Sequence, residues 1–483
     1  MYSRRFLLAG LLATTATAAG ATAPTKSARP VARSDDFARK VDPTAKDIVG
    51  QAGLSGVTGF AVADATSGIN IEQFQADEAL PPASVAKMLT ALYGLDRLGA
   101  DFRFNTRLVS DGVIEGGTLR GDLWLVGGGD PTLNTDDLGR MVADLHRSGV
   151  RSIDGSFYVQ NSALPAIPFI DRDQPDYLGY NPTIGAVNLN FNRVHFEWRR
   201  GADGYRTTMD ARAKRHAPAV EMATMRIVSR DFPVYAYALE KGRDAWTVSR
   251  SALGGGGARW LPVRQPALYA ADVFGQLARA KGISLPAGQV TDRPAKGRIL
   301  VQHASVPLSE MCRDMLKFST NLTAEVIGLQ ASGAKTLRSS AAAMNEWAKE
   351  RFGVDAQLVD HSGLGDRSRI SASDLVQILV AAANGPIGAL MKPIKLRDAN
   401  GKVVDGQGIE VTAKTGTLNF VSTLAGYVIT PQGTKWAFAI VSADLAARGK
   451  IKKSDRERPR GASGWNRRAK SMQQRLLHRW GRA

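Results

Sequence analysis

The sequence predicts an α/β (α+β) fold, in which a helix-and-sheet domain is interrupted by a long strand-rich insert. Strand patterns near the N-terminus lead into a helix that starts at Ser84, and a long run of strand patterns and turns follows it. Helical patterns then return and are followed by three further strands. The length of 483 residues suits about two to four domains. We expect the first part of the interrupted domain at 35–105, the insert at 106–304 and the second part at 305–445.

The first part of the interrupted domain combines helix and strand patterns. The expected elements are a helix over 35–49, a strand over 56–64 and a helix from Ser84 to Gly99. Two prolines precede Ser84, and proline is tolerated where a helix starts. Apolar residues recur at helical spacing from Val85, and Gly99 ends the pattern.

The insert, residues 106–304, is dominated by strand patterns. Residues 118–126 alternate in polarity and predict a strand of an antiparallel sheet. The glycine runs at 127–129 and 254–257 predict turns, since neither matches a phosphate loop or a dinucleotide fingerprint. A helix is expected over 271–281.

The second part of the interrupted domain is helical and then strand-rich. Helices are expected over 307–332 and 336–352, and strands over 408–417, 422–430 and 435–443. Cys312, the only cysteine, lies in a helical pattern and is expected to pack as a small hydrophobic residue. A single cysteine excludes an intramolecular disulfide.

The C-terminal tail, residues 446–483, carries much of the net charge of +18. It holds thirteen basic and two acidic residues, a net charge of +11. Such a tail attracts a polyanion, so it is expected to contact an anionic wall polymer or a membrane surface, unless it is simply solvated. A nucleic-acid partner is not expected for an exported protein. Residues 465–480 predict an amphipathic helix that packs its apolar face inward, namely Trp465, Met472, Leu476 and Trp480.

The N-terminus resembles an export signal. Arg4 and Arg5 precede an apolar run that ends in small residues near 18–23, which is typical of a twin-arginine signal. We expect cleavage of residues 1–23 and a periplasmic mature protein. A retained membrane anchor is the alternative, although threonine and glycine dilute this short run.

Three separated motifs carry residue types suited to acyl transfer. Ser84 and Lys87 lie three residues apart at a helix start, so both side chains emerge on one face. Ser319 and Asn321 offer a hydroxyl and a carboxamide, and Lys414 to Thr417 follow a strand. Serine acyl-transferases that react with penicillin carry Ser-x-x-Lys, Ser-x-Asn and Lys-Thr-Gly in this order.

The chain resembles the class C low-molecular-mass penicillin-binding proteins, which are D-alanyl-D-alanine carboxypeptidases/endopeptidases. The resemblance rests on the three motifs and on residues 98–104, 125–133 and 360–364, and it covers essentially the whole mature chain. It implies a penicillin-binding transpeptidase/β-lactamase-like domain with a five-stranded sheet, interrupted by a two-domain insert. The implied partners are peptidoglycan stem peptides, with β-lactams as covalent inhibitors.

The resemblance also implies catalytic roles. Ser84 attacks the D-Ala–D-Ala carbonyl, and Lys87 accepts its proton if burial and a neighbouring cation such as Lys414 lower the Lys87 pKa. Ser319 relays a proton to the leaving amine. Asn321 orients Lys87 and the substrate amide.

The implied substrate-binding residues lie mainly on the Lys-Thr-Gly strand. Lys414 and Thr415 bind the terminal carboxylate, Gly416 lets the ligand approach the backbone, and the N–H of Thr417 joins that of Ser84 in holding the oxyanion. Asp176 binds the amine of a diaminopimelate stem. Arg367 and Arg369 are both candidates for a substrate carboxylate.

No cofactor or metal is expected, because none of the six histidines shows the spacing of metal ligands. Two other functions stay open: a β-lactamase or esterase on the same residues, and a non-catalytic protein that binds cell wall through its basic tail. The complete set of nucleophile and base residues favours the peptidase.

Overall fold

The main sheet of the protein has six strands. The structure, a computed structural model, describes residues 43–482, so the predicted export signal and the start of the predicted 35–49 helix lie outside the described residues. The strand order is β17-β18-β19-β20-β1-β2, and every neighbouring pair is antiparallel. The strands are β17 (Lys392–Pro393), β18 (Glu410–Leu418), β19 (Val421–Ile429), β20 (Lys435–Ala443), β1 (Val57–Asp64) and β2 (Asn70–Phe74). The resemblance implied five strands, and the additional sixth strand is the two-residue β17.

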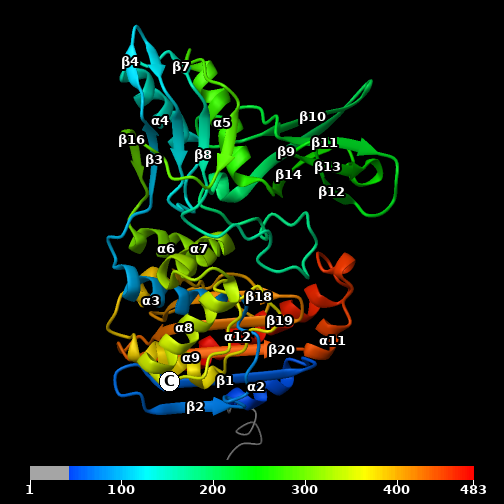
Figure 1. Cartoon of the computed structure of the whole chain (residues 1–483). Coiled ribbons are helices and arrows are strands. Elements are labelled where there is room, and N and C mark those ends of the chain that lie inside the picture. The colour runs from blue at the N-terminus through cyan, green and yellow to red at the C-terminus, as the bar shows by residue number, and fades with distance from the viewer. Residues whose placement is uncertain (1–42, 483) are drawn as a thin grey trace, which may run out of the picture. The chain divides into compact units, whose positions relative to one another are not determined.

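Helices cover both faces of this sheet (Figure 1). One face packs on α3 (Ala86–Leu98), α6 (Leu308–Phe318), α7 (Asn321–Ser332), α8 (Leu337–Phe352) and α9 (Ala372–Ala381). The other packs on α2 (Ala45–Gln51) and α12 (Ala462–Gly481). Strands β19 and β20 are buried almost throughout, which explains why apolar residues predominate in both. The α/β (α+β) fold class is confirmed.

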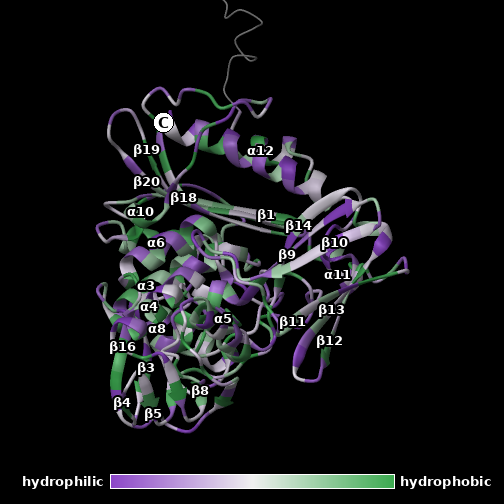
Figure 2. Ribbon diagram, turned by 90° about the horizontal axis from the view of Figure 1, so that it is seen from above, coloured by the Kyte–Doolittle hydropathy of each residue, from purple (hydrophilic) through white to green (hydrophobic). Residues whose placement is uncertain are grey.

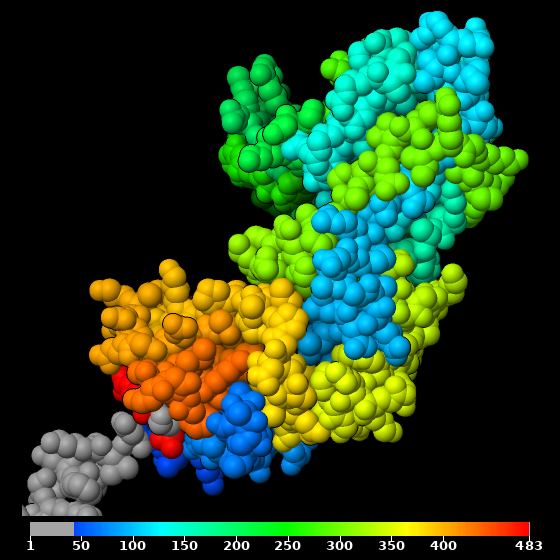
Figure 3. Space-filling view, turned by 90° about the vertical axis from the view of Figure 1, so that its left-hand side faces the viewer, coloured from blue at the N-terminus to red at the C-terminus, as the bar shows by residue number. Residues whose placement is uncertain are grey.

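Helix α12 confirms the amphipathic helix predicted at the C-terminus. Trp465, Met472, Leu476 and Trp480 are all buried, and polar residues alternate with apolar ones along its length (Figure 2). Trp480 packs against Phe60 and Phe438 of the sheet. Residues from both ends of the described chain therefore lie together beside the sheet (Figure 3), and the indole of Trp465 donates to the Ser55 carbonyl.

Residues 105–304 form four smaller sheets around a core of their own. The largest has the order β15-β8-β6-β3-β16, and two others are β10-β9-β14 and β11-β13-β12. Their bounds are β3 (Asn105–Ser110), β6 (Leu123–Val126), β8 (Phe157–Gln160), β15 (Gly288–Thr291), β16 (Arg298–Ala304), β9 (Arg193–Gly201), β10 (Gly204–Asp210), β14 (Gly256–Pro262), β11 (Ala223–Val228), β12 (Tyr235–Glu240) and β13 (Arg243–Ser249). The division into domains at these positions stays a prediction.

Two predictions for this segment are wrong in detail. The strand predicted over 118–126 divides at residues 121–122 into β5 (Thr118–Arg120) and β6, and these two strands belong to different sheets. Strand β5 pairs with β4 (Val113–Glu115) and β7 (Ser152–Asp154). The five-stranded sheet that contains β6 is also mixed rather than antiparallel, because β6 pairs in parallel with β8. The helix α4 (Thr135–Arg147) connects these two strands, and a parallel pair requires such a crossover.

Helix boundaries shift by a few residues from those predicted. The helix expected over 271–281 starts earlier, at Pro266, as α5 (Pro266–Ala280), with proline in its first turn. The helix expected over 307–332 divides into α6 and α7 at Ser319, which adopts a left-handed conformation. Cys312 is fully buried in the core, as predicted. Among the described helices, none is long and apolar enough to cross a membrane.

Candidate active site

Ser84 lies in a short turn that precedes α3. Residues 83–85 form a single 3-10 turn, closed by a hydrogen bond from the Val85 N–H to the Pro82 carbonyl, and α3 begins at Ala86. The sequence predicted Ser84 within the helix itself. The Thr423 hydroxyl of β19 also donates to the Pro82 carbonyl at 2.8 Å, so the sheet holds the turn directly.

Two glycines allow other segments to approach this turn closely. A Cβ on Gly416 would lie 2.0 Å from the Thr423 hydroxyl oxygen and 2.8 Å from the Pro82 carbonyl oxygen. A Cβ on Gly363 would lie 1.8 Å from the Ala83 carbonyl oxygen, and its φ of +73° also favours glycine. The turn that carries Ser84 is therefore packed between the Lys-Thr-Gly strand and the 360–365 loop.

Lys87 is fully buried and donates three hydrogen bonds. Its Nζ lies 2.9 Å from Ser84 Oγ, 2.8 Å from Asn321 Oδ1 and 2.8 Å from the Ser362 carbonyl oxygen. Burial lowers the pKa of Lys87 to about 8, against the opposing effect of Glu325 and Asp360. Of the two causes expected from the sequence, burial lowers the Lys87 pKa, whereas the charge of Lys414 is not among the causes.

Ser319 and Asn321 reach the site because the helix breaks between them. Ser319 ends α6 in a left-handed conformation, and Asn321 is the first residue of α7. The Asn321 side chain uses both ends of its amide, since Oδ1 accepts from Lys87 and Nδ2 donates to the Tyr180 carbonyl at 3.0 Å. A continuous helix would direct these two side chains about 200° apart.

Lys414 is buried on the opposite side of the site. Its Nζ donates to Ser319 Oγ at 3.0 Å and to the Thr415 carbonyl at 2.7 Å. Burial, then the positive charges of Lys87 and Lys392, lower the pKa of Lys414 to about 6. The structure therefore brings together Ser84, Lys87, Ser319, Asn321 and Lys414.

Two buried carboxyls act on Lys87: Asp360, which belongs to the 360–364 motif noted in the sequence, and Glu325, which was not found from the sequence. The Glu325 carboxylate accepts the N–H groups of His361 and Ser362 at 3.0 and 2.9 Å. The Asp360 carboxylate accepts those of Gly363 and Gly365 at 2.7 and 2.6 Å. Burial raises the pKa of both carboxyls, that of Glu325 to about 8. Glu325 is the one charged residue of α7 and follows Asn321 by one helical turn, and this spacing was the available signal.

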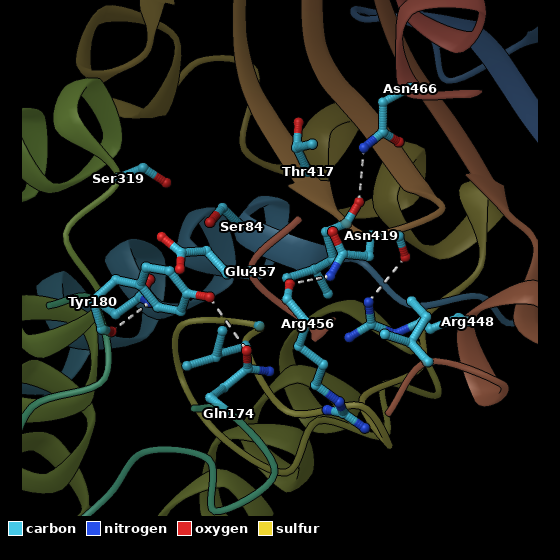
Figure 4. Close-up of a pocket in the computed structure, with 15 residues that line it drawn as sticks. Ser84, Gln174, Tyr180, Ser319, Thr417, Asn419, Arg448, Arg456, Glu457 and Asn466 are labelled. Atoms are coloured by element: carbon cyan, nitrogen blue, oxygen red, sulfur yellow. Dashed lines mark hydrogen bonds between the residues drawn. The ribbon is translucent and has the colours of Figure 1, made fainter. Parts of the chain in front are cut away.

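A pocket of about 310 Å³ opens in front of Ser84 (Figure 4). Gln174 and Tyr180 line it from the inserted segment, and the Tyr180 hydroxyl contacts the Gln174 amide oxygen at 3.3 Å. The segment after β20 lines it as well; the sequence analysis had assigned that segment to the basic tail. Its contributions are Arg448, Ile451, Arg456 and Glu457.

The two arginines from this segment bind one carboxylate. Arg448 and Arg456 both form ion pairs with Asp366. Glu457 pairs with Arg259 of β14 at 2.9 Å, which links the segment to the insert. Neither Arg367 nor Arg369, the two candidates named from the sequence, lines the pocket: Arg367 is exposed, and Arg369 donates to the backbone of its own loop.

Of the five predicted substrate-binding residues, only Thr417 lines this pocket; Lys414, Thr415, Gly416 and Asp176 do not. The exposed carboxylate of Asp176 pairs with Lys453 at 3.2 Å. Thr415 lines a neighbouring cavity, whereas Thr417 lines both. No cluster of three or more potential metal ligands occurs among residues 43–482.

Comparisons with known proteins agree on one family. The model of the D-Ala-D-Ala carboxypeptidase 3 (S13) family matches residues 44–459. A D-alanyl-D-alanine carboxypeptidase of Actinomadura sp. (strain R39) is 27% identical over 453 residues, covering 85% of this chain and 81% of that protein. The D-alanyl-D-alanine carboxypeptidase DacB of Haemophilus influenzae is 25% identical over 397 residues, covering 74% of this chain and 79% of that protein. The crystal structure of penicillin binding protein 4 from H. influenzae has a TM-score of 0.71 at 19% identity, covering 92% of this chain and 100% of that one.

Proposed function

Because the chain belongs to the D-Ala-D-Ala carboxypeptidase 3 (S13) family, we propose that it cleaves peptidoglycan stem peptides through an acyl-enzyme on Ser84. It is a serine-type D-Ala-D-Ala carboxypeptidase/endopeptidase of the class C low-molecular-mass penicillin-binding proteins. The observation that carries the proposal is the Lys87 amine, which lies 2.9 Å from Ser84 Oγ and 2.8 Å from the Asn321 amide oxygen. A nucleophile held against its base is the arrangement that covalent catalysis needs.

The reaction starts with the neutral form of Lys87. As Ser84 Oγ attacks the carbonyl carbon of the penultimate D-Ala, its proton passes to Lys87 Nζ. The backbone N–H groups of Ser84 and Thr417 hold the developing oxyanion, each worth about 3 kcal/mol. The carbon–nitrogen bond then breaks, and the proton reaches the leaving amine through Ser319.

Hydrolysis of the ester completes the cycle. Water gives one proton to Lys87 and adds its oxygen to the acyl carbon, and Ser84 leaves with the proton that Lys87 returns. Lys414 binds the terminal carboxylate of the substrate, because a cation in a buried site forms strong charge-assisted hydrogen bonds. A preference for free C-termini follows from this contact.

Penicillin labelling tests the proposal. Fluorescent penicillin is expected to label the wild-type protein stably and to leave Ser84→Ala unlabelled. Incubation with purified wall fragments, followed by mass analysis, is expected to show loss of a D-Ala residue or cleavage of crosslinked dimers. Rapid turnover of the label would instead indicate a β-lactamase. A folded wild-type protein that neither takes the label nor consumes either fragment would falsify the peptidase assignment.

We further propose that the protein works in the periplasm after its twin-arginine signal is removed, as residues 4–23 suggest. N-terminal sequencing of the protein from periplasmic extracts tests this, and an intact Met1 would contradict it. Two predictions from the sequence stay proposals here: contact of the basic tail with an anionic polymer or membrane, and capture of a stem-peptide amine by Asp176. Loss of activity on amine-bearing stems in Asp176→Asn would support the second.

A further inference from the structure

A second cavity, of about 540 Å³, lies against the same strand as the active site. We name it the basic cavity. Its walls are the loop 394–401, residues 415–417 of β18, residues 422–424 of β19 and residues 467–474 of α12. The comparisons and the proposed chemistry assign nothing to it.

Strand β18 separates the basic cavity from Ser84. Thr415 pairs with Leu424, which belongs to the core beneath α12, and Thr417 pairs with Ser422, whose hydroxyl accepts from Gln473 of α12 at 3.2 Å. Since side chains alternate along a strand, these threonines face α12 while Lys414 and Gly416 face Ser84. Thr417 lines both hollows, so a ligand that passes the end of β18 reaches the basic cavity.

The edge of β18 beside the two hollows is open. β17 pairs only with Thr412 and Ala413, so within the described residues the edge at 414–418 has no neighbouring strand. An extended peptide can therefore lie along this edge between the two hollows.

The basic cavity carries an excess of positive charge. Its four cations are Arg397, Arg467, Arg468 and Lys470, and its single acid is Asp398. The Asp398 carboxylate is engaged by the N–H groups of Asn400 and Lys402, both at 2.9 Å. The three cations of α12 are exposed and form no ion pair within the part of the chain that the structure describes.

The basic residues of α12 differ in whether another side chain binds them. Towards its C-terminal end, Arg475 donates to Gln51, and Arg479 pairs with Glu72 at 3.2 Å. The charge of Arg479 is thus compensated by Glu72, whereas the basic residues of α12 beside the cavity have no acidic partner among residues 43–482. An anion within about 10 Å of these charges feels them at ordinary ionic strength.

We propose that the basic cavity binds the carboxylates of the leaving stem peptide when the enzyme cleaves a crosslink, an inference that rests on the proposed function. A leaving group lies on the Ser319 and Lys414 side of Ser84, because Ser319 supplies its proton. Released D-Ala is small and its one carboxylate is satisfied at Lys414. The leaving half of a crosslink is a peptide with several carboxylates, which extends past Lys414 along the open edge of β18.

The shape of the site favours a peptide over a surface. A membrane or a long wall polymer binds to a broad exposed face, whereas these cations border a hollow that shares Thr417 with the pocket of Ser84. The basic cavity therefore makes the enzyme more efficient on crosslinked dimers and leaves its action on monomeric pentapeptides unaffected.

The test compares two substrates in matched variants. The triple variant Arg467→Gln/Arg468→Gln/Lys470→Gln is expected to lose at least tenfold in kcat/KM on crosslinked dimers, equivalent to about 1.4 kcal/mol. Its D-Ala release from pentapeptide monomers and its rate of penicillin labelling should stay within twofold of wild type. The control Arg199→Gln/Arg200→Gln/Arg206→Gln removes the same charge from exposed residues of β9 and β10 and should change neither substrate.

Several results would overturn the inference. Equal losses on both substrates, or no loss on dimers, would exclude a role for the cavity in selecting the leaving group. Reduced binding to anionic lipid vesicles or to intact wall, with dimer cleavage unchanged, would assign the charges to a surface contact instead. A wild-type enzyme that processes pentapeptides but not dimers would overturn this inference alone, whereas one that is never labelled would overturn the proposed function with it.

Discussion

The buried carboxyl of Glu325 offers a direct test of how Lys87 is prepared for catalysis. It receives the N–H groups of His361 and Ser362, and the carbonyl of Ser362 in turn accepts a hydrogen bond from Lys87 at 2.8 Å. Glu325 therefore acts on Lys87 twice, through its charge and through the loop that it positions. The substitution Glu325→Gln keeps the size of the side chain and prevents its ionisation, which in the wild type has its midpoint near pH 8.

The size of the effect follows from the pKa of Lys87. With a pKa of about 8, roughly a tenth of Lys87 is neutral at pH 7 and about a hundredth at pH 6. In its ionised form Glu325 raises this pKa, so the pKa of Lys87 should be lower in Glu325→Gln. The amide NH2 of glutamine also faces one of the two N–H donors, and the unsatisfied donor costs about 1–3 kcal/mol of unfolding free energy.

Acylation by penicillin as a function of pH measures both effects. In the wild type the second-order rate constant should rise tenfold per pH unit up to a midpoint near 8. In Glu325→Gln the midpoint should move to lower pH, while the plateau falls because the Ser362 carbonyl is no longer fixed. The matched control Glu346→Gln changes an exposed carboxylate of α8 and should leave midpoint, plateau and stability unaltered. A midpoint that stays in place or rises in Glu325→Gln would refute this account of Lys87.

Two further predictions concern Lys414 and α12. Because the pKa of Lys414 is about 6, most of this amine is neutral at pH 7, and a bound carboxylate raises its pKa. Stem-peptide binding to Ser84→Ala should therefore take up protons, and its affinity should weaken as pH rises from 6 to 8. Calorimetry in buffers of different ionisation enthalpy measures the uptake, and proton release on binding would contradict it. Trp480→Ala should lower the free energy of unfolding by about 3–5 kcal/mol, since its buried ring packs on Phe60 and Phe438. Chemical denaturation tests this, and a loss under 1 kcal/mol would show that α12 is dispensable for the fold.

The fold class and the main elements were predictable because the local patterns are strong. The runs that become β19 and β20 are predominantly apolar, and Trp465 and Trp480 recur at helical spacing. The parallel pairing of β6 with β8 was not predictable from the strands themselves. The pairing depends on the crossover through α4. The alternation of residues 118–126 contains no information about that crossover.

In the active site, too, the features set by local sequence were predictable and those set by contacts between distant segments were not. The motif residues could be named because their order along the chain is distinctive. Glu325 was missed because its role depends on the N–H groups of residues 361 and 362, and a sequence pattern carries no record of which backbone donors a carboxylate will meet. The left-handed conformation of Ser319, which ends α6, was also not predictable, because serine has no strong preference for that conformation.

The charge of the C-terminal segment shows why a sum over a stretch of sequence can mislead. The count of +11 treats thirteen basic residues as one tail, yet the fold divides them into groups with different surroundings. Arg448 and Arg456 line the pocket of Ser84 and bind Asp366, and Arg479 pairs with Glu72 on the far side of the sheet. Lys450, Lys452, Arg458 and Arg460 are exposed elsewhere on the segment, whereas Arg467, Arg468 and Lys470 lie together beside the open edge of β18. The position of these charges, rather than their number, favours a peptide carboxylate at the active site over a polymer at a distance from it.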